Sequence, residues 1–92
     1  MATFYIGETI ICNLTIKDSN RNLVDPDTVP AITINSSSGT AVVDKESMKK
    51  DSTGLYHYDF QTEDASAGVY GIVYKVTDST RVTILKDSLE LA

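Results

Sequence analysis

The sequence predicts an all-β fold in which two antiparallel sheets pack face to face as a sandwich. Apolar side chains recur at every second position over much of the chain, which is the period of a half-buried strand. Clusters of Asp, Asn, Ser, Gly and Pro separate these stretches at intervals of roughly ten residues, as they do in two-sheet sandwiches. No window keeps the 3.6-residue period of a helix. With 92 residues, the chain has the size of one domain, residues 1–92.

Seven stretches have strand character. In the first half of the chain the second stretch is the clearest, because Ile10, Cys12 and Leu14 fall on one face and only Ile11 breaks the alternation. The third begins at a proline, and the first and fourth are short and rich in β-branched or aromatic residues. The predicted strands are residues 3–6, 9–17, 30–36, 40–44, 54–61, 69–76 and 81–91.

The second half holds the strongest alternation. Tyr56, Tyr58 and Phe60 share one face of the fifth stretch, and the sixth places aromatic and aliphatic residues together, namely Tyr70, Ile72, Tyr74 and Val76. We therefore expect these side chains to be buried, and Tyr5, which has the opposite parity to its neighbours, to be exposed. Before the fifth stretch, residues 49–54 are predicted as a turn, and residues 44–52 form one helical turn at most.

The last stretch changes parity along its length. Val82 and Ile84 lie on one face, whereas Leu89 and Leu91 lie on the other. A single extra residue would bring both pairs to the same face, so the pattern predicts a β-bulge within residues 86–88.

Charge and cysteine content exclude several classes of function. The net charge is −5 and the basic residues are dispersed, which argues against a nucleic-acid partner. With Cys12 as the one cysteine, the chain forms no internal disulfide. The first residues lack the basic and apolar regions of a signal peptide, and no apolar run is long enough to cross a membrane.

His57 and Cys12 are the candidates for catalysis, and both have a simpler interpretation. A histidine that acts as a general base or metal ligand needs partners, and the sequence holds no second histidine. His57 has the parity opposite to the three aromatics, so it is expected to face solvent beside Asp59. Cys12 lies on the apolar face of its strand, where a cysteine behaves as a small inert hydrophobe.

The loop DSNRNLVDPD resembles the start of a calcium-binding loop. Asp18, Asn20 and Asn22 occupy its alternate ligand positions, but Leu23 replaces the required glycine and Val29 the final glutamate. A surface turn is the favoured interpretation, and weak calcium binding stays open as the alternative. Its ligands would be Asp18, Asn20, Asp25 and Asp27.

Other catalytic motifs have no support in the sequence. The adjacent carboxylates Glu63 and Asp64 precede a strand and are interpreted as a solvated turn rather than a glycosidase pair. Phosphate-binding, dinucleotide-binding and serine-hydrolase motifs do not occur. The sequence thus predicts no enzyme and no catalytic, cofactor-binding or metal-binding residue.

The stretch TEDASAGVYGIVYKV resembles one strand of immunoglobulin-like domains. In that strand an acidic residue, a small residue, a tyrosine and the core cysteine follow one another, matched here by Asp64, Gly68, Tyr70 and Ile72. The resemblance implies that Tyr70 bonds back to the turn before its strand, as a tyrosine corner. It also implies that Cys12 and Ile72 replace the disulfide by apolar packing. The chain has no tryptophan and so departs from antibody domains.

Over nearly its whole length the chain is similar to bacterial and phage immunoglobulin-like modules of the macroglobulin and invasin type. The shared features are the Ile–Gly–Glu at residues 6–8, the turn at residue 18, and the stretches GLYHYDF and GVYGIVY. The resemblance implies a seven-stranded immunoglobulin-like sandwich without catalytic residues. Short copies of these modules look like phage or prophage structural proteins.

The expected function is therefore that of a non-enzymatic structural or accessory protein of a phage or prophage virion, in the virion or the host cytoplasm. Its partners would be virion proteins or further copies of itself. A carbohydrate-binding or cell-surface adhesion module is the alternative.

Overall fold

Eight strands form the protein, and the polypeptide between them runs in turns and loops. The computed structural model describes residues 2–92, so Met1, the first residue of the expected domain, lies outside the described residues. The strands are β1 (Ala2–Phe4), β2 (Thr9–Thr15), β3 (Ala31–Asn35), β4 (Ala41–Ser47), β5 (Lys49–Ser52), β6 (Leu55–Gln61), β7 (Gly68–Asp78) and β8 (Arg81–Leu91).

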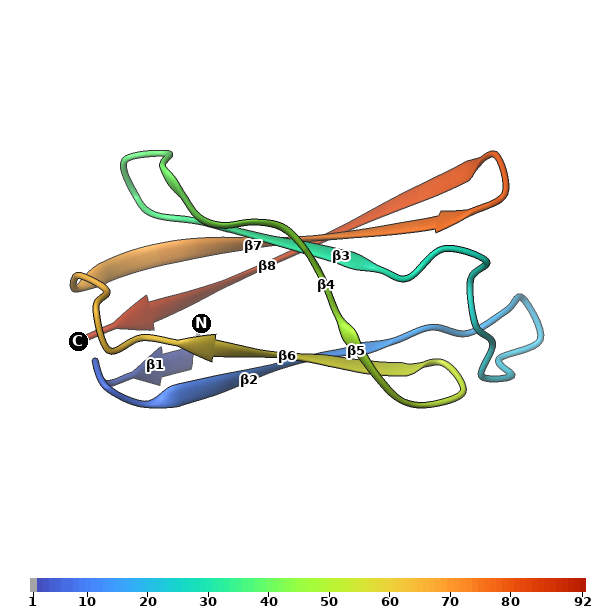
Figure 1. The fold of residues 1–92 in the computed structure, drawn as a ribbon, viewed down its shortest axis with the longest axis horizontal. Helices are drawn as coiled ribbons and strands as arrows, with labels where there is room; N and C mark the ends of the chain where they lie inside the picture. The colour runs from blue at the N-terminus through green and yellow to red at the C-terminus, as the bar shows by residue number, and fades with distance from the viewer. Residues whose placement is uncertain (1) are drawn as a thin grey trace.

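The strands make two layers that pack as a sandwich (Figure 1). The larger sheet has the order β1-β8-β7-β3-β4 and the smaller one the order β2-β6-β5. All pairings are antiparallel except that of β1 with β8, which run in the same direction. The predicted two-sheet, all-β architecture is confirmed, whereas the prediction of purely antiparallel sheets is wrong for the larger sheet.

The core lies between the layers and follows the predicted alternation. Ile32 and Ile34 of β3 are fully buried, and Phe60 of β6 meets Tyr70 of β7 edge to face with ring centroids 6.0 Å apart. Tyr58 is only partly buried against this core, and Tyr5 is exposed as predicted. The remaining core side chains are Ile10, Cys12, Leu14, Val43, Met48, Tyr56, Ile72, Tyr74, Val76, Leu89 and Leu91.

The hydroxyl of Tyr70 bonds back to the turn before its strand. It donates to the carbonyl of Ser66 at 2.6 Å and accepts from the Ser66 amide at 3.2 Å. This local prediction is confirmed. Because the ring is buried and the hydroxyl satisfied, Tyr70 fastens the β6–β7 connection to the core.

The segment predicted as a turn is a strand that changes sheets. β4 continues to Ser47, and after the single residue Met48 the chain enters the other sheet as β5 (Figure 1). Met48 is buried, and its amide donates to the Pro30 carbonyl at 2.9 Å. The number of strands is therefore eight rather than seven. The four residues of β5 are all exposed and show no alternation, so the pattern could not reveal them.

The β-bulge predicted near Lys86–Ser88 does not occur. β7 and β8 pair residue for residue from Gly68↔Leu91 to Asp78↔Arg81, without interruption. Leu89 and Leu91 face the core, whereas Val82 and Ile84 face outward and are about half exposed. The change of parity arises because residues 81–87 are exposed on both faces of β8, and only the end with Leu89 and Leu91 packs on the core.

Candidate functional site

His57 lies on the outer face of the smaller sheet, on the parity the sequence predicts. Its Nδ1 is 2.6 Å from Oδ1 of Asp51 and its Nε2 is 3.9 Å from Oδ1 of Asp59. Asp51 belongs to β5, where the sequence predicts a turn, so the pattern does not indicate this contact. The ring is partly buried, and its short contact is a hydrogen bond to Asp51 across the outer face of the sheet.

Cys12 is buried between the sheets, where its thiol stays protonated and is a poor nucleophile. Burial raises the pKa of its thiol to about 11, and the negative charges of Asp87 and Asp59 act in the same direction, against a hydrogen bond with Tyr74. Only the thiolate is a strong nucleophile. At neutral pH the thiol is therefore protonated and inert.

The carboxylates of the loop between β2 and β3 hold separate parts of the backbone. Oδ1 of Asp18 accepts from the amides of Asn20 and Asn22 at 2.8 and 2.9 Å. Oδ2 of Asp27 accepts from the amide of Ser79 at 2.8 Å. Across residues 2–92, no group of three or more His, Cys, Asp or Glu side chains is arranged to hold a metal ion.

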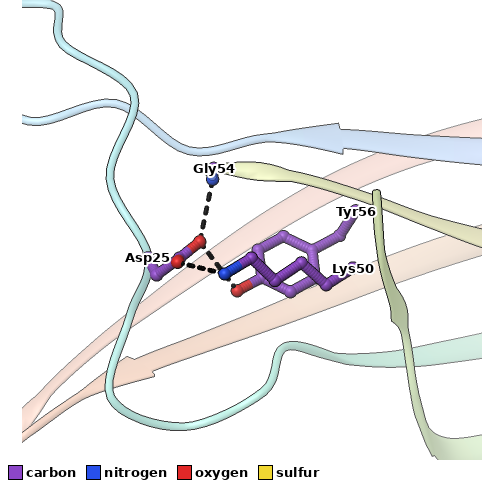
Figure 2. Close-up of polar contacts among 4 residues, drawn as sticks. All are labelled: Asp25, Lys50, Gly54 and Tyr56. Carbon is purple, nitrogen blue, oxygen red and sulfur yellow. Dashed lines mark hydrogen bonds and ion pairs between the residues drawn. The ribbon is translucent and has the colours of Figure 1, made fainter. Parts of the chain in front are cut away.

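Asp25 is the centre of a small polar cluster (Figure 2). Its carboxylate accepts from Lys50 Nζ at 2.6 Å, the Gly54 amide at 2.8 Å and the Tyr56 hydroxyl at 3.1 Å. The hydrogen bond from Lys50, followed by that from Gly54, lowers the pKa of Asp25. The cluster ties the long loop to the β5–β6 hairpin, so its role is structural.

The two sides of the sandwich differ in how they are closed. On one side the chain itself crosses between the layers from β4 to β5 (Figure 1). On the other side β2 and β8 are the neighbouring edges, and β1 pairs only with residues Leu89–Leu91 of β8. Among residues 2–92 no other strand pairs with this side of β8, so the rest of the strand has a free edge. We call the side between β2 and β8 the open side.

Shallow cavities follow the open side. One of about 160 Å³ lies between β1, β2 and β8 and includes Cys12 and Asp87. Another of about 160 Å³ lies between Ile16 and Leu85, and a third of about 390 Å³ reaches Arg81 at the hairpin tip. The lining of these cavities mixes aliphatic and charged groups.

The edges differ in protection against pairing with another chain. β4 carries adjacent charges, a positive φ of 50° at Lys45 and interruptions in its register with β3, and β5 is short and charged. Such features discourage the addition of a further strand. β8 has an unbroken register, and Val82, Ile84 and Leu85 are 53%, 48% and 42% exposed. β2 is also regular, with no charged residue and an exposed Ile11.

The open side is thus the surface most suited to binding, and sequence reasoning did not identify it. The signal available in the sequence is the parity of Val82 and Ile84, which predicts a bulge when both faces are assumed to be covered. Within residues 2–92 no helix is long and apolar enough to cross a bilayer. Comparison of the chain with known protein families, curated proteins and solved structures finds no match.

Proposed function

We propose that the protein is a non-enzymatic interaction domain that binds other proteins by adding a strand at the free edge of β8. The observation that carries this proposal is the unpaired, regular edge with apolar side chains exposed on both faces of one strand. A free edge offers backbone donors and acceptors, and exposed side chains add selectivity.

The cellular setting that we propose is a phage or prophage particle, in which the domain decorates a capsid or tail. Support comes from the resemblance of the stretches GLYHYDF and GVYGIVY to phage immunoglobulin-like modules. An acidic net charge of −5 also favours protein partners over nucleic acid.

Quantitative mass spectrometry of purified particles tests the function. We expect the unmodified chain to be present and Ile84→Pro to be lost, because proline removes the amide that a partner strand would use. Ile84→Thr keeps that amide and a β-branched side chain, so it is the matched control and should be retained. Particles without the unmodified chain would exclude the virion role, and equal retention of all three chains would exclude the edge.

A carbohydrate-binding or adhesion role is the second candidate. Five serine and threonine side chains line a cavity of about 280 Å³ between two loops, together with Asp64 and Tyr70. They are Ser36, Ser37, Ser38, Thr40 and Ser66. A glycan array, probed with and without calcium, tests this role, and uniformly blank binding would contradict it.

A further inference from the structure

The backbone at the end of β8 shows which of its residues point to the free edge. Ala92 donates its amide to the Phe4 carbonyl at 2.8 Å and accepts from the Ile6 amide at 3.2 Å, so both of its polar groups face the β1 side. Successive residues of a strand alternate between its two neighbours. The polar groups of Val82, Ile84 and Lys86 therefore point to the edge that β1 leaves uncovered.

This edge is held in place before any partner arrives. β8 pairs with β7 over its full length, and the hairpin tip is fastened to the long loop. The Ser79 amide donates to Asp27 at 2.8 Å, and the Asp27 amide donates to Asp78 at 3.1 Å. An ordered edge loses little conformational freedom when a strand is added.

We propose that the strand added at this edge is β8 of a second copy of the chain, running antiparallel, with Ile84 facing Ile84 of the partner subunit. This inference rests on the proposed use of the β8 edge for binding. The two larger sheets would continue into one another across a two-fold axis, which is the commonest symmetry of protein dimers.

The sequence of β8 is complementary to itself in this register. Arg81 lies opposite Asp87 of the partner subunit, and the symmetry repeats this pair at the other end. Thr83 lies opposite Leu85 of the partner subunit. Opposite charges placed directly across two strands stabilise their pairing, and like charges destabilise it.

The register shifted by two residues towards the C-terminus is less favourable. A shift by two residues would bring Leu85 onto the two-fold axis and place Arg81 opposite Leu89, which is already paired with β1. It would also replace the charge pair by Thr83 opposite Asp87. The register centred on Ile84 is the one that combines charge complementarity with the uncovered part of the edge.

Exchange of the two charges tests the pairing. We expect the mass measured by light scattering to rise from that of a 10.0 kDa monomer towards a dimer as the concentration approaches about 1 mM, since an edge contact is small and weak. Arg81→Asp or Asp87→Arg alone should weaken association by about tenfold or more, because each places like charges opposite one another.

The double variant Arg81→Asp with Asp87→Arg should restore association. The two positions are six residues apart on one strand, about 20 Å, so they cannot interact within one chain. Rescue therefore reports an intermolecular pair. Circular dichroism and thermal unfolding of each variant show that the sheets remain formed, which separates weakened pairing from misfolding.

Cross-linking in a Cys12→Ala background fixes the register. Ile84→Cys would place two sulfurs across the axis with Cα atoms about 5.5 Å apart, within disulfide range. Leu85→Cys is the matched control, because its symmetric mate lies on the diagonal at about 7–8 Å. Preferential oxidation of Ile84→Cys to a dimer is the expected result, and preferential oxidation of Leu85→Cys would overturn the register.

A monomer over the whole concentration range, or association unaffected by the single charge reversals, would overturn the inference. Neither result would affect the mass spectrometry of purified particles. In that experiment, loss of the Ile84→Pro variant from the particles shows that some partner uses the β8 edge. Failure of self-pairing and failure of the proposed function are thereby distinguished.

Discussion

Phe60 and His57 lie three residues apart on β6, yet they have different roles in stability. Phe60 is 4% exposed and packs on Tyr70, so Phe60→Ala should lower the free energy of unfolding by about 3–5 kcal/mol. His57→Ala removes the contacts with Asp51 and Asp59 on the outer face, which are together worth about 1 kcal/mol at most. Chemical denaturation measures both, and equal losses would contradict the orientation of β6.

Asp25 should make stability depend on pH at the acid end. The hydrogen bond from Lys50 is the main cause that lowers the native pKa of Asp25 below 3.8. The contribution of the carboxylate to stability is therefore fully present above pH 3.8 and is lost as the pH falls through the lowered native pKa. Asp25→Asn should unfold at lower denaturant concentration than the unmodified chain at neutral pH, and the difference should narrow in acid. Asp44→Asn, at an exposed position of β4, is the control for replacing an aspartate by an asparagine. A stability difference between Asp25→Asn and the unmodified chain that does not change with pH would mean that the negative charge of Asp25 does not stabilise the fold.

At the scale of the elements, the β5–β6 turn depends on a glycine. Gly54 has a φ of 73°, and a Cβ there would lie 2.7 Å from the Ile16 carbonyl oxygen and 3.0 Å from the Val24 nitrogen. Gly54→Ala should therefore cost about 1–3 kcal/mol. Gly71→Ala is the matched control, because nothing lies within 4 Å of its added Cβ and it should change stability by about 0.5 kcal/mol at most. Thermal unfolding of the two variants compares them directly.

Strands with one buried face could be predicted from the sequence, and those without one could not. The residues of β6 alternate in polarity because Tyr56 and Phe60 enter the core, so the sequence pattern is enough to predict the strand. β5 has no buried side chain and exists because β6 offers it an edge, which is a tertiary cause. The parity of Val82 and Ile84 likewise does not predict their environment. The pattern shows which face of a strand is apolar, but not whether another sheet covers that face.

Hydrogen exchange along β8 should alternate in dilute protein. The amides of Thr83 and Leu85 are directed to β7, and those of Val82 and Ile84 to the free edge. The former should exchange slowly and the latter at rates near those of unstructured peptide. NMR exchange measurements resolve the two sets. Uniform protection at low concentration would contradict an open edge in the monomer.

At the scale of the whole molecule, the open side is a consequence of connectivity. The crossing from β4 to β5 closes one side of the sandwich, and the brief pairing of β1 with β8 closes only part of the other. Neither feature can be deduced from the alternation of side chains, because alternation does not say which strands lie at the edges. Candidate groups that sequence does reveal, such as Cys12 and Tyr70, belong to the core.

Packing of the two layers on each other should make the protein sensitive to alkali. Burial raises the pKa of Cys12 from 9.0 to about 11 and also raises the pKa of Tyr74. Both groups ionise more readily in the unfolded chain. The stability that their neutral forms contribute is therefore fully present below about pH 9 and is lost as the pH rises towards about 11.

Cys12→Ala isolates the contribution of the thiol, since Tyr74 is unchanged in it. We expect the midpoint of urea unfolding to fall less steeply in this variant than in the unmodified chain between about pH 9 and 11, the interval over which the thiol ionises differently in the two states. Labelling gives a second measurement: at pH ~8 the raised pKa alone should make the native thiolate about 100-fold scarcer than in the unfolded chain. Identical slopes for the two chains, together with rapid labelling of the native protein, would mean that the layers separate readily along the open side and expose Cys12 to solvent.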